Sequence, residues 1–577
     1  MQVPQKFLKI ETGQFSTAGR KPENQDFYGI LEPRGQALVH KGIAVAIADG
    51  ISTSPVAHIA AETAVKSFLS DYYCTSDTWS VKTAASRVIS ATNSWLYGQT
   101  KQASCRDKGY VCTFSALVLK GRQAHLFHLG DSRIWRLAGQ GLEKLTEDHR
   151  VQLSSEDSYL ARGLGLVQAV EIDYRAFELR SGDVFVLTTD GVHEFIRQGD
   201  IAAAIVQSAS LDDAAEAIVE QALEAGSTDN LTIQIVRVAD LPDASATDLL
   251  VEEGTLPPSP LPRVPGEFEG YRLLRVLHAS NRSHIFLGED ETSGDLVALK
   301  FPSMDMRDDE NYLRRFAMEE WIARRISSPH VLKATEIPKE RQSLFLSSEF
   351  VEGQTLRQWM TDNPHPDLEA VRALAGQIAK GLRAFHRKEM VHQDLRPENI
   401  LIDKAGTVKI IDFGSVRIAG VMEAAPALDT SEVLGTHQYT APELFLGYLG
   451  TERSDLFSLG VVVYEMLTGR LPYGASVARA TSEKAQAALR YRSACSVTER
   501  VPDWVDGAIY RAVHPVPGKR YDALSAFLED LHRPNPEFHS ARSVPFAERD
   551  PVRFWQFVSA ILALLCALLF SQLFGNP

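Results

Sequence analysis

The sequence predicts an α+β protein of several domains, with two large domains joined by an acidic connector and one apolar helix near the C-terminus. At 577 residues the chain is too long for a single hydrophobic core. Residues 240–268 are rich in proline and carry six acidic residues against one arginine, a composition that favours an extended, solvated connector. Residues 554–574 contain no charged residue over a length that suits a membrane-spanning helix.

Composition and charge limit the partners that the chain can bind and the cellular compartment in which it works. The net charge of -14 excludes a typical nucleic-acid partner, since no basic block is available to replace the counterions of a phosphate backbone. The five cysteines are odd in number and form no Cys-x-x-Cys pair, which indicates a reducing compartment. The N-terminus lacks a secretory pattern, and Arg542, Arg549 and Arg553 precede the apolar segment. These features predict a single-pass protein of the cytoplasmic (inner) membrane, with its other domains in the cytoplasm.

Acidic residues in the first half fall at the ends of predicted strands. The apolar runs 42–48 and 183–189 each end in an Asp-Gly corner, and helical patterns cover 55–72, 80–100 and 211–225. One Asp-Gly corner alone is more often a turn than a ligand. Five aspartates at such boundaries favour a site for hard divalent cations, which prefer oxygen ligands. They are Asp26, Asp49, Asp131 after the strand 124–129, Asp190, and Asp229 before the strand 232–238.

This ordered series resembles the type 2C metal-dependent protein phosphatases over about residues 7–239, and we assign residues 1–239 to that domain. The resemblance implies an α-β-β-α sandwich that binds two or three Mn²⁺ or Mg²⁺ ions and dephosphorylates proteins on Ser or Thr. It implies that Asp49, Asp190 and Asp229 hold the first metal, and that Asp49 and the Gly50 carbonyl hold the second. Asp26 would act through water, and Asp131 matches the position of a third, weaker metal.

Departures from this family leave two roles open. The phosphate-binding arginine of the family falls at Lys21 here, and Arg20 precedes it, so both are candidates to hold the substrate phosphate. Ile51 stands where some relatives carry a general-acid histidine, which leaves the proton donor to the leaving group unidentified.

The second half carries the pattern of a phosphoryl-transfer site. Val297-Ala298-Leu299-Lys300 ends a strand, and a helical run follows with Glu319 and Glu320 as alternative partners for the lysine. His392-Gln393-Asp394-Leu395-Arg396-Pro397-Glu398-Asn399 precedes Asp412-Phe413-Gly414, a spacing that assembles two carboxylates and an amide around ATP and Mg²⁺.

These motifs resemble the eukaryotic-like Ser/Thr protein kinases, and we assign residues 269–533 to a bilobal kinase domain. The resemblance implies that Lys300 binds the α and β phosphates and pairs with Glu319. It implies that Asp394 orients the substrate hydroxyl, that Asn399 and Asp412 hold Mg²⁺, and that Arg396 lies near the γ phosphate. The segment 346–353 would bond adenine through its backbone, at Glu349 and Val351.

Two departures bear on the activity of this kinase domain. His278, Ser280 and Ser283 stand where the phosphate-binding loop of the family has glycines, which permit close backbone approach to phosphates. Gln393 replaces the arginine that pairs with a phosphorylated activation segment in the family, so that ion pair is not available here.

The sequence therefore predicts a membrane-anchored bifunctional enzyme, a Ser/Thr protein phosphatase joined to an ATP-dependent Ser/Thr protein kinase. The alternative is an active phosphatase that is regulated or targeted by a nucleotide-binding pseudokinase domain. The connector is long enough for the phosphatase to reach its own kinase domain, with Thr430, Ser431 and Thr436 as candidate sites. A juxtamembrane linker at 534–552 and a transmembrane helix at 553–574 complete the predicted organisation.

Overall fold

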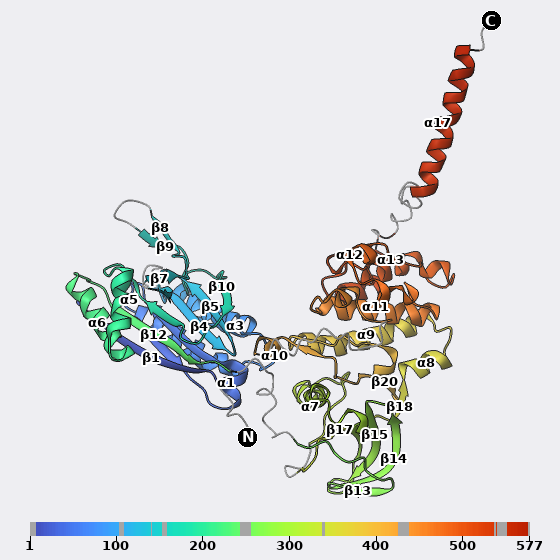
Figure 1. Cartoon of the computed structure of the whole chain (residues 1–577), viewed down its shortest axis with the longest axis horizontal. Helices are drawn as coiled ribbons and strands as arrows, with labels where there is room; N and C mark the ends of the chain where they lie inside the picture. Colours follow the sequence, from blue (N-terminus) through green and yellow to red (C-terminus); the bar gives the residue numbers. More distant parts are fainter. Residues whose placement is uncertain are drawn as a thin grey trace.

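The structure is a computed structural model, and two folded domains lie side by side in it (Figure 1). It describes residues 7–102, 109–139, 141–152, 158–242, 256–336, 341–424, 438–535, 538 and 551–574. The candidate phosphorylation sites Thr430, Ser431 and Thr436 lie outside the described residues.

Two five-stranded antiparallel sheets form the middle of the N-terminal domain. The first sheet has the order β1-β12-β11-β6-β7, made of β1 (Lys9–Thr17), β12 (Leu231–Asp240), β11 (Val184–Thr188), β6 (Arg133–Ala138) and β7 (Gly141–Lys144). The second has the order β10-β5-β4-β3-β2, made of β10 (Asp173–Glu178), β5 (Gln123–Leu129), β4 (Phe114–Lys120), β3 (Ile43–Asp49) and β2 (Asp26–Leu31). A separate hairpin pairs β8 (Arg150–Gln152) with β9 (Ser158–Leu160).

Alternation of side chains along β3 shows how the layers form. Its alanines pack against α2 (Ala57–Cys74) and α3 (Val81–Gln102), while Ile43, Val45 and Ile47 pack into the core between the two sheets. On the far side, α5 (Gln198–Gln207) and α6 (Leu211–Glu224) cover the first sheet. The layers are therefore helix, sheet, sheet and helix, with two short helices, α1 (Gln36–Lys41) and α4 (Asp190–His193), at their edges.

The predicted secondary structure of this domain is confirmed closely. The strands predicted at 42–48 and 183–189 and the helices predicted at 55–72, 80–100 and 211–225 all lie within two residues of β3, β11, α2, α3 and α6. Hydrophobic periodicity is a strong signal here because each element buries one well-defined face.

The C-terminal domain begins with a five-stranded sheet of order β13-β14-β15-β16-β17 beside α7 (Glu310–Arg325). The strands are β13 (Gly266–Phe268), β14 (Tyr271–Ala279), β15 (Ser283–Asp290), β16 (Leu296–Pro302) and β17 (Leu346–Glu349). The last part of the predicted connector packs onto this lobe: Leu344 N donates to Pro257 O at 2.9 Å, and β13 pairs with β14.

A larger helical lobe follows. Its core is shared by α9 (Leu368–His386), α11 (Glu452–Thr468), α13 (Asp503–Ala512) and α14 (Leu524–His532). The shorter elements are β18 (Gly353–Thr355), α8 (Leu356–Asp362), β19 (Met390–Val391), β20 (Ile400–Asp403), β21 (Val408–Ile410), β22 (Arg417–Ile418), α10 (Ala419–Ala424) and α12 (Glu483–Ala487). Single 3₁₀ turns are η3 (Met304–Met306), η4 (Pro397–Asn399), η6 (Pro442–Leu446), η7 (Gly474–Arg479), η8 (Ala494–Ser496) and η9 (Pro517–Lys519).

Two buried charges stabilise this lobe, and one of them, Asp455, holds the loop that precedes η4. Asp455 at the start of α11 accepts the backbone N–H groups of His392 and Gln393, both at 2.9 Å. Arg520 pairs with Glu443 at 2.6 Å, and both side chains are buried. Because both charges are hydrogen-bonded by neighbouring groups, neither is an unpaired charge in the interior of the lobe.

The chain ends, within the described residues, in α17 (Pro551–Phe574) (Figure 1). Apolar side chains such as Trp555, Phe557 and Leu564 are exposed along it. In the part of the chain that was described and searched, no helix combines the length and hydropathy needed to cross a membrane. The transmembrane segment at 553–574 stays a prediction.

Two candidate active sites

Strand ends from both sheets of the N-terminal domain bring its acidic residues together. Asp26 begins β2 and lies opposite Asp49, which ends β3. Asp131 follows β5, Asp190 follows β11 by two residues and begins α4, and Asp229 lies two residues before β12. Burial raises the pKa of Asp49, and the charges of Asp26, Asp190, Asp131 and Asp229 raise it further, so the carboxylates are close enough to influence one another's ionisation. All five predicted metal-binding aspartates thus gather at one end of the sandwich.

Burial makes this cluster hard to ionise fully. It raises the pKa of Asp26 to about 6, although Thr189 and Thr232 donate to its carboxylate at 2.9 and 2.7 Å. Burial, with the nearby Asp131 and Asp229 charges, raises the pKa of Asp190 to about 7. One carboxylate oxygen each of Asp26 and Asp190 is buried without a hydrogen-bond partner among the described residues. The raised pKa values show that the five carboxylates have too few positive partners, and thus too little positive charge, to be fully ionised together.

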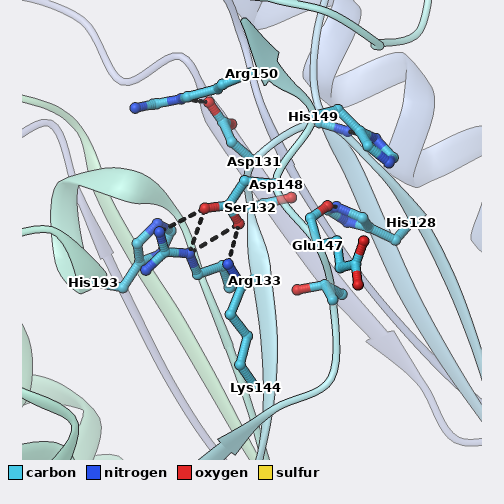
Figure 2. Close-up of polar contacts among 12 residues, drawn as sticks. His128, Asp131, Ser132, Arg133, Lys144, Glu147, Asp148, His149, Arg150 and His193 are labelled. Carbon is cyan, nitrogen blue, oxygen red and sulfur yellow. Dashed lines mark hydrogen bonds and ion pairs between the residues drawn. The ribbon is translucent and has the colours of Figure 1, made fainter. Parts of the chain in front are cut away.

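Two basic residues supply part of that charge. Arg150, on β8, pairs with Asp131, and it contacts Asp190 and Glu194 at 2.6 Å each. Figure 2 shows the Arg150 guanidinium beside Asp131, next to a second ion-paired group around Arg133 and Asp148. Lys21 pairs with Asp229 and donates to Ser52 at 2.7 Å. Arg20 turns away and donates to the Leu223 carbonyl at 3.4 Å. Lys21 is therefore the better placed of the two phosphate-binding candidates.

The donor set of this acidic centre suits a hard divalent cation. Among the described residues no three acidic, histidine or cysteine side chains stand ready-made as a metal site, because the basic side chains hold the carboxylates instead. The chemistry nevertheless fits, since the donors are oxygens, the charge is in excess and two buried oxygens are unpartnered. Residue 50 must be glycine for steric reasons, because a Cβ there would lie 2.7 Å from atoms of Ala57.

The second centre lies between the two lobes of the C-terminal domain. Lys300 on β16 contacts Glu319 on α7 at 2.6 Å and Asp412 at 3.4 Å. Burial disfavours the charge on Lys300, but Asp412 and Glu319 outweigh it and raise the pKa of the lysine. Lys300 in turn holds the pKa of Asp412 below its usual range. Lys300 and Asp412 thus stay charged and paired, whereas burial raises the pKa of Glu319 to about 7.

The same geometry resolves the alternative between the two glutamates. Glu320 contacts Arg324 at 2.5 Å and Arg341 at 2.8 Å, on a different side of α7 from Lys300. The side chains of Glu320 and Arg341 are both buried, so this pair stabilises the lobe. Glu319 is the residue that pairs with Lys300.

The catalytic loop places its polar groups beside Asp412. Asn399 donates to the Asp394 backbone carbonyl at 2.9 Å and to its carboxylate at 3.1 Å, and Arg396 lies 3.6 Å from that carboxylate. Ile411 N donates to Asn399 O at 2.9 Å, which ties the loop to the residue before Asp412. Asp412 and Gln393 both have positive φ, 69° and 65°. Non-glycine residues in this conformation are uncommon and are held by their surroundings.

The loop that lacks glycines closes on itself through serine. Ser280 Oγ accepts the N–H of Ser283 at 3.1 Å and donates to Ser283 O at 3.0 Å. The tip is also tied down, because Tyr312 of α7 and the Ser303 N–H donate to the Arg282 carbonyl. The hairpin therefore has an ordered form without the glycines of the family.

The segment predicted to bind adenine follows β17. The Glu349 side chain accepts from Lys409 Nζ at 2.8 Å and from Lys333 N at 2.9 Å, so it is engaged with neighbouring strands and loops. Val351 is half-buried. The Glu349 N–H also donates to the Lys333 carbonyl at 3.0 Å. The role of these two backbones in binding adenine stays a prediction.

Sequence reasoning missed several residues of the first centre. Arg150, Glu194, Thr189 and Thr232 contact the acidic cluster, yet none belongs to the Asp-Gly corners that revealed the site. The two threonines flank predicted strand ends, so their positions carry a weak signal. Arg150 lies in a hairpin whose placement over the cluster depends on the fold.

Family models match both domains of the chain. The protein phosphatase 2C family model matches residues 16–232, and the protein kinase domain model matches residues 271–536. Serine/threonine-protein kinase PrkC of Bacillus subtilis is 33% identical over 264 residues, covering 45% of this chain and 40% of that protein. Serine/threonine-protein kinase PknL of Mycobacterium tuberculosis is 33% identical over 262 residues, covering 45% of this chain and 64% of that protein. The chain thus spans less than two thirds of the length of these relatives.

Solved structures of bacterial phosphatases align with the first domain. The serine/threonine phosphatase PstP/Ppp of Mycobacterium tuberculosis has 20% identity and a TM-score of 0.35, covering 41% of this chain and 100% of that one. The S. agalactiae serine/threonine phosphatase has 26% identity and a TM-score of 0.35, covering 40% of this chain and 100% of that one. On the family matches, the chain contains an N-terminal protein phosphatase 2C domain followed by a C-terminal protein kinase domain.

Proposed function

We propose that this chain is a bifunctional signalling enzyme that phosphorylates proteins on Ser or Thr with ATP and also removes such phosphates. The observation that carries this proposal is that both centres are assembled in one chain. Lys300 pairs with Glu319 and Asp412 in the kinase domain, and five aspartates converge in the phosphatase domain. A purely structural domain has no need of either constellation.

In the phosphatase domain, we assign Asp49, Asp190, Asp229 and the Gly50 carbonyl to two Mn²⁺ or Mg²⁺ ions, with Asp131 for a third. Bound ions of this kind activate water for attack on phosphorus. Thr189 and Thr232 orient Asp26, which acts through water, and their hydrogen bonds support that role. Lys21 orients the substrate phosphate, and Arg150 must leave Asp190 before a cation can take its place.

In the kinase domain, Lys300 positions the ATP phosphates, and Asn399 and Asp412 hold Mg²⁺. Asp394 accepts or orients the proton of the substrate hydroxyl, and Arg396, 3.6 Å from it, lies on the side of the γ phosphate. The backbones at Glu349 and Val351 bond adenine. The serine-closed hairpin at Ser280 covers the phosphates in place of a glycine-rich loop.

We also propose that α17 attaches the chain to the cytoplasmic membrane, with both catalytic domains in the cytoplasm. The exposed apolar side chains of Trp555, Phe557 and Leu564 support this assignment, since a helix with such a surface is poorly suited to water. The anchor would be supported if the full chain sedimented with membranes and a chain truncated to residues 1–545 did not. A full chain that stays in the supernatant would contradict it.

The two activities are tested separately. A Ser/Thr phosphopeptide with Mn²⁺ should be hydrolysed by wild type but not by Asp49→Asn, with the surface variant Asp71→Asn as control. A generic protein substrate with Mg-ATP should be labelled by wild type but not by Asp394→Asn, with Asp362→Asn as control. Hydrolysis without any labelling would favour the alternative, a phosphatase regulated by a nucleotide-binding pseudokinase domain.

A further inference from the structure

The two domains contact each other through a defined surface. On the phosphatase side it comprises α1, residues 77–83 at the start of α3, and Lys120 at the end of β4. On the kinase side it comprises α10, residues 387–389, and Trp321 of α7. Figure 1 shows α10 reaching the N-terminal domain next to α1. Val39 on α1 packs against the hydrophobic core of the kinase helical lobe. We call this surface the interdomain contact.

A buried lysine lies at its centre. Lys120 Nζ donates to the Gly420 carbonyl at 2.6 Å and contacts Glu423 at 3.3 Å, and its side chain is 1% exposed. Lysine is almost never buried so completely unless it is paired. Both partners of Lys120 belong to α10 of the kinase domain, so the kinase completes a site that the phosphatase domain leaves open.

The start of α3 gives a second, independent anchor. The first turn of this helix contains no acidic residue, although free N–H groups there favour negative charge. The kinase domain supplies it. Glu389 accepts from Ser80 N at 2.6 Å and from Thr83 Oγ1 at 2.5 Å, and Glu423 accepts from Val81 N at 2.9 Å. Two kinase glutamates thus cap a phosphatase helix.

Backbone fit and ring contacts complete the interdomain contact. Gly420 N donates to Thr78 O at 3.0 Å, and a Cβ at Gly420 would lie 2.6 Å from the Trp79 carbonyl oxygen. Trp79 Nε1 donates to Arg387 O at 3.0 Å. His40 lies 5.7 Å from the Trp321 ring at the end of α7, the helix that carries Glu319. The phosphatase domain therefore touches both α7 and the segment after Asp412.

The position of α10 is relevant to Gln393, which stands where the kinase family has an arginine. The α10 helix follows Asp412-Phe413-Gly414 closely. Gln393 cannot form the ion pair to a phosphorylated segment that the arginine would make. The interdomain contact instead holds α10, in the segment that follows Asp412, through Lys120. Lys120 is also about 20 Å along β4 from Thr113, which donates to Asp49 O, so the acidic centre stays clear.

We propose that the phosphatase domain is a docking partner of α10 and α7, and that this contact holds the kinase in the arrangement in which Lys300 pairs with Glu319. The proposal rests on the kinase activity assigned above. It predicts that kinase activity depends on residues of the phosphatase domain that take no part in phosphate hydrolysis.

The test uses the full chain in an Asp49→Asn background, so that phosphate once added is retained. Lys120→Met and Glu389→Gln weaken the contact from opposite sides, and Lys66→Met, an exposed lysine of α2, is the control. Each contact variant should lower labelling of a generic substrate roughly tenfold, and Lys66→Met should not. The proposal would be overturned if labelling fell in Glu389→Gln alone, or if it fell in neither contact variant.

Two further readouts separate docking from folding and from catalysis. In chains with Asp49 intact, both contact variants should hydrolyse a small aryl phosphate at the wild-type rate; loss in Lys120→Met would show that the surface serves the phosphatase fold instead. Amide exchange at Ser80, Val81 and Gly420 should rise at least about tenfold in both variants. If the Asp49→Asn parent chain labels nothing, the proposed kinase function fails, and unchanged amide exchange in both contact variants would separately reject docking.

Discussion

In the kinase domain the carboxylates of Glu319 and Asp412 lie 2.6 and 3.4 Å from Lys300, so both acidic groups have a positive partner within the site. In the phosphatase domain five aspartates converge, and burial raises the pKa of Asp26 and Asp190. Their positive partners, Lys21 and Arg150, come from a loop and a hairpin outside the sheet ends.

The difference teaches how each centre depends on its ligand. The kinase centre is organised by its own side chains and can keep its geometry before nucleotide binds. The phosphatase centre carries excess negative charge, so a divalent cation should stabilise it strongly and displace its basic side chains. Variants that change the charge balance of either centre should therefore have different consequences.

The largest effects are expected from the groups that carry the chemistry. Asp49→Asn should lower phosphopeptide hydrolysis by at least about 100-fold, because it removes a proposed ligand of both metals. The same variant should keep its kinase activity, so net labelling of a generic substrate should not fall. Steady-state assays of both activities on one preparation check this, and a parallel loss of both would contradict independent centres.

The two neighbouring glutamates of α7 should separate activity from stability. Glu319→Gln should lower kinase activity by about 100-fold through misplacement of Lys300, with little change in the thermal midpoint. Glu320→Gln should keep its specific activity but lose about 3 kcal/mol of stability, because it leaves the buried Arg341 short of charge. Denaturant unfolding and kinase assays on both variants measure the split. The reverse pattern would assign the lysine partner to Glu320.

A smaller effect is expected from Arg150. Arg150→Ala removes a cation that competes with the metal for Asp131 and Asp190, so the affinity for Mn²⁺ should rise by about tenfold. Calorimetric titration of the full chain with Mn²⁺ measures it. Arg162→Ala, which removes an exposed arginine near the same hairpin, serves as control. Weaker binding in Arg150→Ala would show that the guanidinium supports the metal site instead.

The smallest effect concerns pH in the absence of metal. Asp190 has a folded pKa of about 7, above its ordinary value of 3.8. The folded chain therefore holds a proton that the unfolded chain releases, and the stability from this group falls as pH rises from about 4 to 7. With chelator present, wild type should lose on the order of 2 kcal/mol relative to Asp190→Asn across this window. If the stability of wild type and of Asp190→Asn changed equally with pH, the pKa of Asp190 would not be raised in the folded chain.

Much of both centres could be predicted from local sequence. The Asp-Gly corners at Asp49 and Asp190 end apolar strands, because short-range pattern fixes where a strand ends. The resemblance to protein kinases implied Glu319, but the residues alone left Glu320 open, and the contacts of α7 decided between them. Arg150 and the interdomain contact at Lys120 could not be found in this way. Their partners lie tens to hundreds of residues away, and only the packing of hairpins and domains brings them together. Which of Arg20 and Lys21 faces the site likewise depends on tertiary structure, because the folded chain places Lys21 against Asp229 and Arg20 against the Leu223 carbonyl.

The central claim is that one chain carries both opposing activities on a shared pool of phosphoprotein. The most direct measurement incubates residues 1–545 with radiolabelled ATP, Mg²⁺ and Mn²⁺, comparing wild type, Asp49→Asn, Asp394→Asn and the double variant. We predict that label on the chain accumulates in Asp49→Asn, stays low in wild type and vanishes in the double variant. An Asp49→Asn chain that remains unlabelled while wild type hydrolyses a phosphopeptide would contradict the claim.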